Sequence, residues 1–196
     1  EKLTGVETTI AQSFIDRITL RGTLFLMDVD GAIANRTLLF SPSQIVRQRE
    51  NLGKIRSRGI EFEITTDLDP KTRAAVRYQY ADSKIEESLV PAHEGLRTPQ
   101  VPYHQASLDL QREWTNRFTS NIEARYASSQ FEDDLNRFLL SDYFTLELTL
   151  RYNITQSLEI YAAAENLLNQ QYELGRIPFP TYGPPRFVQL GVRFKN

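Results

Sequence analysis

Three segments near the end of the chain alternate apolar and polar residues with a period of two. In residues 144–152, apolar side chains occupy the even positions from Phe144 to Tyr152, and polar or charged side chains occupy the odd positions between them. Residues 158–165 and 187–194 repeat this alternation. Successive side chains of a β-strand point to opposite faces of a sheet, so the pattern predicts strands with one apolar and one polar face.

The same alternation runs through the rest of the chain and predicts about nine strands in all. The upstream segments that carry it are residues 2–12, 18–39, 55–68, 73–84, 103–111 and 118–130. No segment keeps helical spacing over three turns. The predicted fold class is therefore all-β.

The connections between these segments alternate in length. The short ones are residues 13–17, 69–71 and 114–116, and the long ones are residues 40–54, 85–102, 131–141 and 171–185. Tight turns on one side and long loops on the other are typical of outer-membrane β-barrels. Most predicted strands also reach the ~9–11 residues that a tilted transmembrane strand needs, whereas a strand of a soluble protein usually has about 5–6.

The apolar faces carry further marks of a membrane barrel. They hold no Lys or Arg at their centres, and aromatic residues such as Phe144 and Tyr152 stand at their ends, where a barrel has its interfacial girdles. The sequence therefore predicts a transmembrane antiparallel β-barrel, with the apolar face on lipid and the charged face towards the lumen. The long link before the last strand predicts a periplasmic C-terminus.

The strand count suggests that the barrel extends beyond this chain. A closed bacterial barrel of a single chain has an even number of strands, and about nine do not close. The chain begins at Glu1 without an initiator Met or a signal peptide, as a mature exported protein or a fragment would. We expect residues 1–196 to form the C-terminal part of a larger barrel.

Composition narrows the chemistry. A formal net charge of −2 gives no basic footprint for nucleic acid. The absence of cysteine excludes disulfides, thiolate metal sites and a Cys nucleophile. The chain contains no apolar run of the length that a transmembrane helix requires.

A few residues suggest other chemistry. Asp28 and Asp30 follow a hydrophobic stretch and have the spacing of the nucleophile and acid/base of haloacid-dehalogenase phosphatases. Such enzymes alternate strands and helices, which this chain does not, so we interpret both as carboxylates where a strand leaves the membrane. Residues 132–134 (Glu-Asp-Asp) could hold Ca²⁺ on a loop, but a solvated acidic loop is the simpler interpretation. His93 is expected to be a solvated loop residue and His104 an interfacial one. No metal site or catalytic group is predicted.

Short motifs near the end of the chain resemble TonB-dependent outer-membrane receptors. Their residues are Glu165, Asn166, Leu167, Leu168 and Asn169 with Tyr172 downstream, and then Gly183, Pro184, Pro185 and Arg186 before the last strand. Upstream, residues 53–63 resemble the family's "G-x-x-x-x-x-G-hydrophobic-E" strand, and residues 102–108 its "P-x-H-x-x-S-L" strand start. The resemblance covers essentially the whole chain.

The resemblance implies a barrel of 22 strands with a plugged lumen. Such receptors import scarce, large nutrients, with energy supplied by the TonB complex. The ligand class expected here is a ferric siderophore, with cobalamin, haem or a glycan as alternatives within the family. This sequence contains neither the plug domain nor the TonB box. The resemblance implies no enzyme activity and no cofactor. The alternative of another class is a passive porin or an adhesin barrel.

Two sets of candidate site residues follow from the barrel. The lumen-facing charges expected to contact the plug are Arg77, Asp109, Glu123, Arg125, Glu147, Arg151, Glu159, Glu165 and Arg193. They also suit simple pairing across strands. Candidates for substrate contact are aromatic and Arg residues of the long loops, namely Arg47, Phe138, Tyr172, Arg176 and Tyr182.

Overall fold

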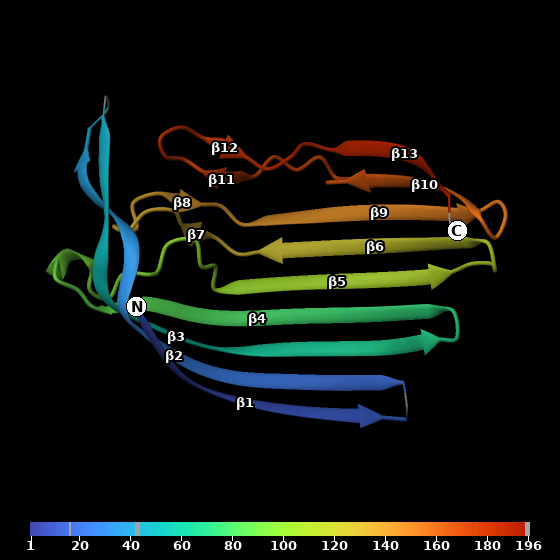
Figure 1. Cartoon of the computed structure of the whole chain (residues 1–196), viewed down its shortest axis with the longest axis horizontal. Coiled ribbons are helices and arrows are strands. Elements are labelled where there is room, and N and C mark those ends of the chain that lie inside the picture. The colour runs from blue at the N-terminus through green and yellow to red at the C-terminus, as the bar shows by residue number, and fades with distance from the viewer. Residues whose placement is uncertain (16, 42–43, 195–196) are drawn as a thin grey trace.

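The computed structural model describes the backbone of residues 1–15, 17–41 and 44–194, with the side chains of all of these but Leu52. The described residues form one nine-stranded sheet in the order β1-β2-β3-β4-β5-β6-β9-β10-β13, in which each strand is antiparallel to its neighbours (Figure 1). The strands are β1 (Lys2–Phe14), β2 (Ile18–Phe40), β3 (Ile45–Asp69), β4 (Thr72–Glu87), β5 (His104–Glu113), β6 (Phe118–Ala127), β9 (Tyr143–Asn153), β10 (Leu158–Glu165) and β13 (Phe187–Phe194).

Smaller elements lie in the long connections, at what we call the loop end of the sheet. A 3₁₀ turn, η1 (Pro91–His93), follows β4. Two short ladders are formed by β7 (Gln130–Phe131) with β8 (Leu139–Leu140), and by β11 (Glu173–Gly175) with β12 (Thr181–Tyr182). The tight turns lie at the opposite end, the turn end (Figure 1). Neighbouring strands of the main sheet follow chain order throughout, as predicted.

The sheet is a single layer without a hydrophobic core. Among the described residues only six hydrophobic side chains are buried, and four of these are alanines. Large apolar side chains instead stand exposed on one face; Leu24 is 59% exposed and Leu190 81%. A soluble sheet would bury that face against a second layer. Here the face is left for another apolar medium, as predicted for a lipid-facing barrel wall.

Strand register explains why the faces stay separate. Leu148 lies level with Ile122 on β6 and Ala164 on β10, whereas Glu147 lies level with Glu123. Residues that lie level with one another therefore share a face of the sheet, the apolar face for the row of Leu148 and the polar face for the row of Glu147. The alternation seen along the sequence becomes continuous across the sheet because the register keeps like residues in line.

Aromatic side chains border the apolar face at both ends. Towards the loop end, the rings of Tyr80 and Tyr103 stack at 6.0 Å, and His104 lies among them, as expected for an interfacial residue. Towards the turn end, Trp114 donates from Nε1 to Ser120 Oγ at 2.9 Å, and Phe118 lies level with Tyr152. These belts match the two interfacial girdles of membrane barrels.

The largest departure from the prediction is the link at residues 40–54. The prediction of a long loop there is wrong, because β2 and β3 continue as a paired hairpin up to Phe40 and Ile45. Both faces of this extension carry polar residues, so the sequence shows no alternation there. The short-turn prediction for residues 13–17 includes Asp16, which lies outside the described residues. No helix in the described part of the chain has the length and hydropathy to cross a membrane.

Candidate functional site

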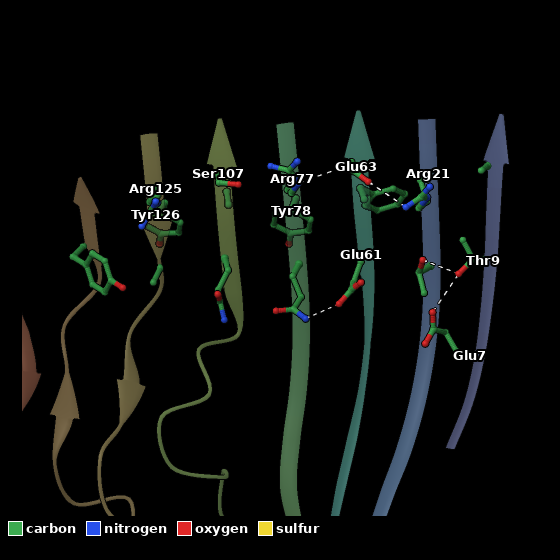
Figure 2. Close-up of a pocket in the computed structure, with 18 residues that line it drawn as sticks. Glu7, Thr9, Arg21, Glu61, Glu63, Arg77, Tyr78, Ser107, Arg125 and Tyr126 are labelled. Atoms are coloured by element: carbon green, nitrogen blue, oxygen red, sulfur yellow. Dashed lines mark hydrogen bonds and ion pairs between the residues drawn. The ribbon is translucent and has the colours of Figure 1, made fainter. Parts of the chain in front are cut away.

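The polar face of the sheet holds a hollow of about 710 Å³. Side chains from β1 to β6 and from β9 line it (Figure 2). Those labelled in the view are Glu7, Thr9, Arg21, Glu61, Glu63, Arg77, Tyr78, Ser107, Arg125 and Tyr126. The charged members come from the alternate positions that the sequence assigned to the lumen.

Several polar side chains in this hollow are paired across strands. Glu63 on β3 lies 3.6 Å from the guanidinium of Arg21 on β2 and accepts a 3.1 Å hydrogen bond from Arg77 on β4. Glu61 accepts a 2.8 Å hydrogen bond from the amide of Gln79. The simple alternative of cross-strand pairing therefore holds for this part of the polar face. Further along, Arg193 contacts Glu159 at 3.3 Å.

Three carboxylates form a row that is less well matched. Asp109 on β5 lies level with Glu123 on β6, and Glu123 lies level with Glu147 on β9. Arg125 contacts Glu123 at 3.0 Å and Glu147 at 3.9 Å, and the amide of Asn121 donates to Asp109 at 3.3 Å. Like charges directly opposite each other destabilise a sheet. Among the described residues, Arg125 is the only cation in an ion pair with these three carboxylates, since the nearby Arg77 pairs with Glu63.

A second hollow of about 370 Å³ lies beside this row, lined in part by Asp109, Glu123 and Arg125. We call Asp109, Glu123 and Glu147 the acidic row. Two other predicted lumen residues, Arg151 and Glu165, stand on the same face by their register with Tyr161 and Phe187. The structure thus brings all nine predicted lumen charges to one face of the sheet.

The loop candidates for substrate contact differ in how far they are already engaged. Phe138 packs on Phe40, with ring centroids 5.3 Å apart. The ring of Tyr172 stacks on Tyr143 at 4.4 Å, and Arg176 contacts Glu173 at 2.6 Å. Phe138 thus joins its loop to the end of β2, Tyr172 packs its loop on the start of β9, and Arg176 pairs within its own loop.

The two remaining loop candidates have free contact groups. Tyr182 on β12 is 47% exposed. In the guanidinium of Arg47, Nε and Nη2 are buried and have no hydrogen-bond partner among the described residues. A buried donor without a partner costs about 1–3 kcal/mol. A hydrogen-bond acceptor on a bound ligand would remove this cost at Arg47.

Carboxylates of residues 132–134 accept hydrogen bonds that stabilise the loops. Glu132 accepts hydrogen bonds from the backbone N–H groups of Arg176 and Ile177, in the loop that follows β10. Asp133 accepts from the backbone of Arg137 and Phe138 in its own loop. The interpretation as a solvated acidic loop is wrong, because Asp133 and Asp134 are 1% and 2% exposed. No cluster that could hold a metal ion occurs among the described residues.

The side chain of His93 is also buried, where a solvated one was expected. It is 1% exposed, and its Nε2 lies 3.0 Å from Oδ2 of Asp134. Asp134 accepts two further hydrogen bonds from Thr37, 97 residues away in the chain. Sequence reasoning missed this cluster because no local pattern links its three members.

The fold contradicts the alternative in which Asp28 and Asp30 are the acidic pair of a phosphatase. The described residues form antiparallel sheets without the α-helices that alternate with strands in such enzymes. Asp28 contacts Arg56 at 2.8 Å and Lys54 at 2.9 Å, on the part of β2 beyond the aromatic belt. These two cations hold the pKa of Asp28 well below its usual range. It is an ion-pair partner at the loop end.

The motif after β10 forms a compact lock. Asn166, 3% exposed, has the positive φ of 43° that Asn tolerates better than most residues. Its Nδ2 donates to the carbonyls of Gln170 and Pro184, both at 2.9 Å, and its Oδ1 accepts from the N–H of Gln170 at 3.0 Å. One amide therefore ties the end of β10 to the segment that enters β13.

The other motif residues complete this lock. The N–H of Leu167 donates to the carbonyl of Leu146 at 2.7 Å, and the N–H of Arg186 donates to Asn169 at 2.9 Å. At Gly183 the ring of Tyr172 occupies the space that a Cβ would need. Glu165 ends β10, and Pro184 and Pro185 lead into β13. The motif positions the last strand.

The family model for the β-barrel of TonB-dependent receptor-like proteins matches residues 1–167. The chain belongs to the TonB-dependent receptor family. Membership explains the single-layer sheet with an exposed apolar face and places the chain in an outer-membrane barrel.

Curated relatives agree with the TonB-dependent family. The chain is 27% identical over 167 residues to the ferrichrome outer membrane transporter/phage receptor of Escherichia coli K12, covering 79% of this chain and 22% of that protein. It is 24% identical over 146 residues to the ferrioxamine B receptor of Salmonella typhimurium, covering 70% and 21%. The chain thus spans about a fifth of these curated relatives.

Solved TonB-dependent structures share the fold. The siderophore receptor PiuA of Acinetobacter baumannii superposes with a TM-score of 0.80 at 19% identity, over 98% of this chain and 28% of that one. The ferric yersiniabactin uptake receptor FyuA of Yersinia pestis gives 0.79 at 16%, over 98% and 30%. The copper transporter OprC gives 0.76 at 15%, over 98% and 31%. The predicted all-β barrel wall is confirmed.

Proposed function

We propose that this chain is the C-terminal part of the barrel of a receptor that imports a ferric siderophore by TonB-dependent active transport. The family assignment supports the transport mechanism. The names of the curated relatives support the ligand class, since they include receptors for ferrioxamine B and ferrichrome. With the long loops outside the cell, β13 runs towards the periplasm and the C-terminus is periplasmic.

The acidic row is the single structural observation that carries the proposal. It lies on the polar face of the sheet beside a hollow, and among the described residues only Arg125 forms an ion pair with it. A basic side chain of a plug domain would complete it, because charged hydrogen bonds are worth about 1.5–3 kcal/mol each. The other lumen charges on this face would add polar contacts to the same plug. Pulling by TonB would then break these contacts and open a path.

Substrate contact would fall to the loop end. Arg47 and Tyr182 are the best placed of the five loop candidates, because their contact groups are not used within the described residues. Phe138, Tyr172 and Arg176 would shape the loops on which these two stand. Outer-membrane lipid is the expected partner of the apolar face.

Two alternatives lead to different results in the same assay. A cobalamin, haem, glycan or copper receptor of the same family would transport another ligand. Copper is included because the chain is similar in fold to the copper transporter OprC. A passive porin or an adhesin barrel would show no dependence on TonB at all.

The test measures uptake of radioactive iron by cells that express the intact receptor as their sole siderophore receptor. Iron supplied as ferrichrome or ferrioxamine B should enter only when TonB is present. Exchanging Glu123→Gln and Glu147→Gln together should loosen the plug. We expect entry of a small dye to rise about tenfold, equivalent to about 1.4 kcal/mol.

Glu61→Gln is the matched control, because it lies on the same face but bonds the neutral amide of Gln79. It should leave dye entry unchanged. Iron entry without TonB would contradict the transport mechanism. An unchanged dye entry in the double variant would contradict the assignment of the acidic row to the plug.

A further inference from the structure

Beyond the aromatic belt, the lipid-facing side of the sheet changes from apolar to charged. At the level of Tyr80 this face carries Leu24 and Ile60. Nearer the loop end the same face carries Asp28 and Arg56, which pair at 2.8 Å. The β2–β3 register does not shift between these two levels, so strand parity keeps these residues on one face. This part of the wall is therefore suited to water on its outer side.

The opposite, polar face becomes apolar at the same level. On β2 the alternate positions that follow Arg21 and Thr23 on this face are Phe25, Met27 and Val29. The two faces thus exchange their polarity along one strand. A wall that is only solvated on both sides beyond the membrane would not need apolar side chains on its inner face.

A row of aliphatic side chains crosses four strands on this inner face. Its members, which lie level with one another on β1 to β4, are Leu3, Val29, Ile55 and Ile85. Met27 stands beside the row and packs on Gly5, where a Cβ would lie 3.2 Å from its Cγ. We call Leu3, Met27, Val29 and Ile55 the apolar shelf.

Only one end of the row is covered within the described residues. Ile85 is fully buried where the loop after β4 runs beside it, and its N–H donates to the carbonyl of Leu96 at 2.9 Å. At the other end Leu3 is 65% exposed, and Val29 and Ile55 are half-buried. A further strand paired with β1 would extend the wall sideways and would leave this face open.

The position of the shelf narrows what can cover it. Lipid lies on the other face, which is already charged at this level. The plug contacts proposed above are polar and lie at the acidic row, on β5, β6 and β9. The shelf lies on β1 to β3 towards the loops, which a ligand would meet first. Apolar patches with polar surroundings mark binding sites, and the proposed function supplies a ligand here.

We propose that the apolar shelf binds an aliphatic chain of the transported ligand, which is therefore an amphiphilic iron chelate. The three strands of the shelf span about 10 Å, since neighbouring strands lie about 4.8 Å apart, and this width suits an acyl chain of medium length. The polar, iron-binding part of the chelate would lie over the hydrated rows next to the shelf. This inference rests on the proposed function, because it names the class of ligand for that transport.

A first measurement needs no ligand and separates a ligand site from a plug contact. The chain has no cysteine, so Val29→Cys and Asp30→Cys can be made singly in an otherwise cysteine-free intact receptor. Asp30 is the matched control, because it follows Val29 and stands on the opposite face. A water-soluble maleimide should label both at similar rates. If Val29→Cys is shielded while Asp30→Cys reacts, another part of the receptor covers the shelf and the proposal is overturned.

A matched pair of chelates then tests the class of ligand. Ferrioxamine B and its N-octanoyl derivative share their iron-binding groups, so calorimetry on the intact receptor isolates the effect of the chain. The octanoyl derivative should bind at least about tenfold more tightly, because burial of apolar surface is favourable. Val29→Asn combined with Ile55→Asn should abolish this gain. Asp30→Asn, the same exchange on the opposite face, should keep it.

The outcomes separate this inference from the proposed function. Equal affinities for the two chelates, no binding of the octanoyl derivative, or a gain that survives in the double variant would each overturn the shelf as a site for an aliphatic chain. If the double variant does not fold, the labelling of Val29→Cys in the presence and absence of the octanoyl derivative decides, since a bound chain should protect the thiol. The proposed function fails on a different result, namely iron uptake that does not require TonB.

Discussion

Replacing Leu148 by arginine should lower the free energy of unfolding of the intact receptor by about 2–4 kcal/mol, the cost of an Arg at the bilayer midplane. Leu148 stands at the centre of the apolar face of β9, between the aromatic residues Phe144 and Tyr152, and lies level with Ile122 and Ala164. Its side chain has no polar group near it in this row. Denaturant unfolding of the receptor in phospholipid vesicles measures the loss.

The neighbouring residue supplies the control. Thr149 lies on the polar face, level with Asn121 and Ala163. Arginine there would reach the water-filled side and the negative acidic row, so Thr149→Arg should change the unfolding free energy by less than about 1 kcal/mol. Equal losses for the two variants would mean that the faces are not divided between lipid and water.

Replacing Asn166 by alanine should cost about 2–4 kcal/mol of stability. The change removes three hydrogen bonds from a side chain that is 3% exposed. It also places alanine at φ 43°, a region that costs a residue without the Asn side chain of order 1 kcal/mol. The freed carbonyls of Gln170 and Pro184 lie near the surface, so water recovers part of the loss. Unfolding of the intact receptor in the same vesicles gives the number.

Two further exchanges at Asn166 separate its two contributions. Asn166→Gly keeps the positive φ without strain and should therefore lose less than alanine. Asn166→Asp keeps the acceptor for the N–H of Gln170 but loses both donations. If glycine and alanine cost the same, the backbone contributes nothing. If the Asn166→Asp variant is as stable as the unmodified protein, the hydrogen bonds that Asn166 donates to the carbonyls of Gln170 and Pro184 do not hold the last strand.

The division of the chain into strands could be predicted because one physical rule dominates it. A membrane barrel wall is wet on one face and apolar on the other, so period-two alternation persists along every spanning strand. The prediction of a loop at residues 40–54 was wrong because this segment does not separate lipid from water, so the rule does not apply to it. The outer part of the β2–β3 hairpin has polar residues on both sides, such as Arg47 and Glu50, so the sequence shows no alternation there and predicted a loop.

The functional candidates divide in the same way. The lumen charges were found because strand parity alone puts Asp109, Glu123 and Glu147 on one face. Their alignment in a row depends on register, which the sequence did not reveal. The cluster of Thr37, His93 and Asp134 was missed because its members come from β2, from the loop after β4 and from the loop between β7 and β8. For Asn166 the motif pointed to the right residue, and its tolerance of positive φ was a usable signal for the turn.

The central claim is that this chain is a wall of an outer-membrane barrel with lipid on its apolar face and the lumen on its polar face. Spin labels placed one at a time at residues 144–152 of β9, in the intact receptor in lipid, test it most directly. We expect the even positions to be reached by oxygen from the bilayer and the odd positions by a water-soluble nickel complex, with a period of two. Equal access of the nickel complex to both sets would contradict the account.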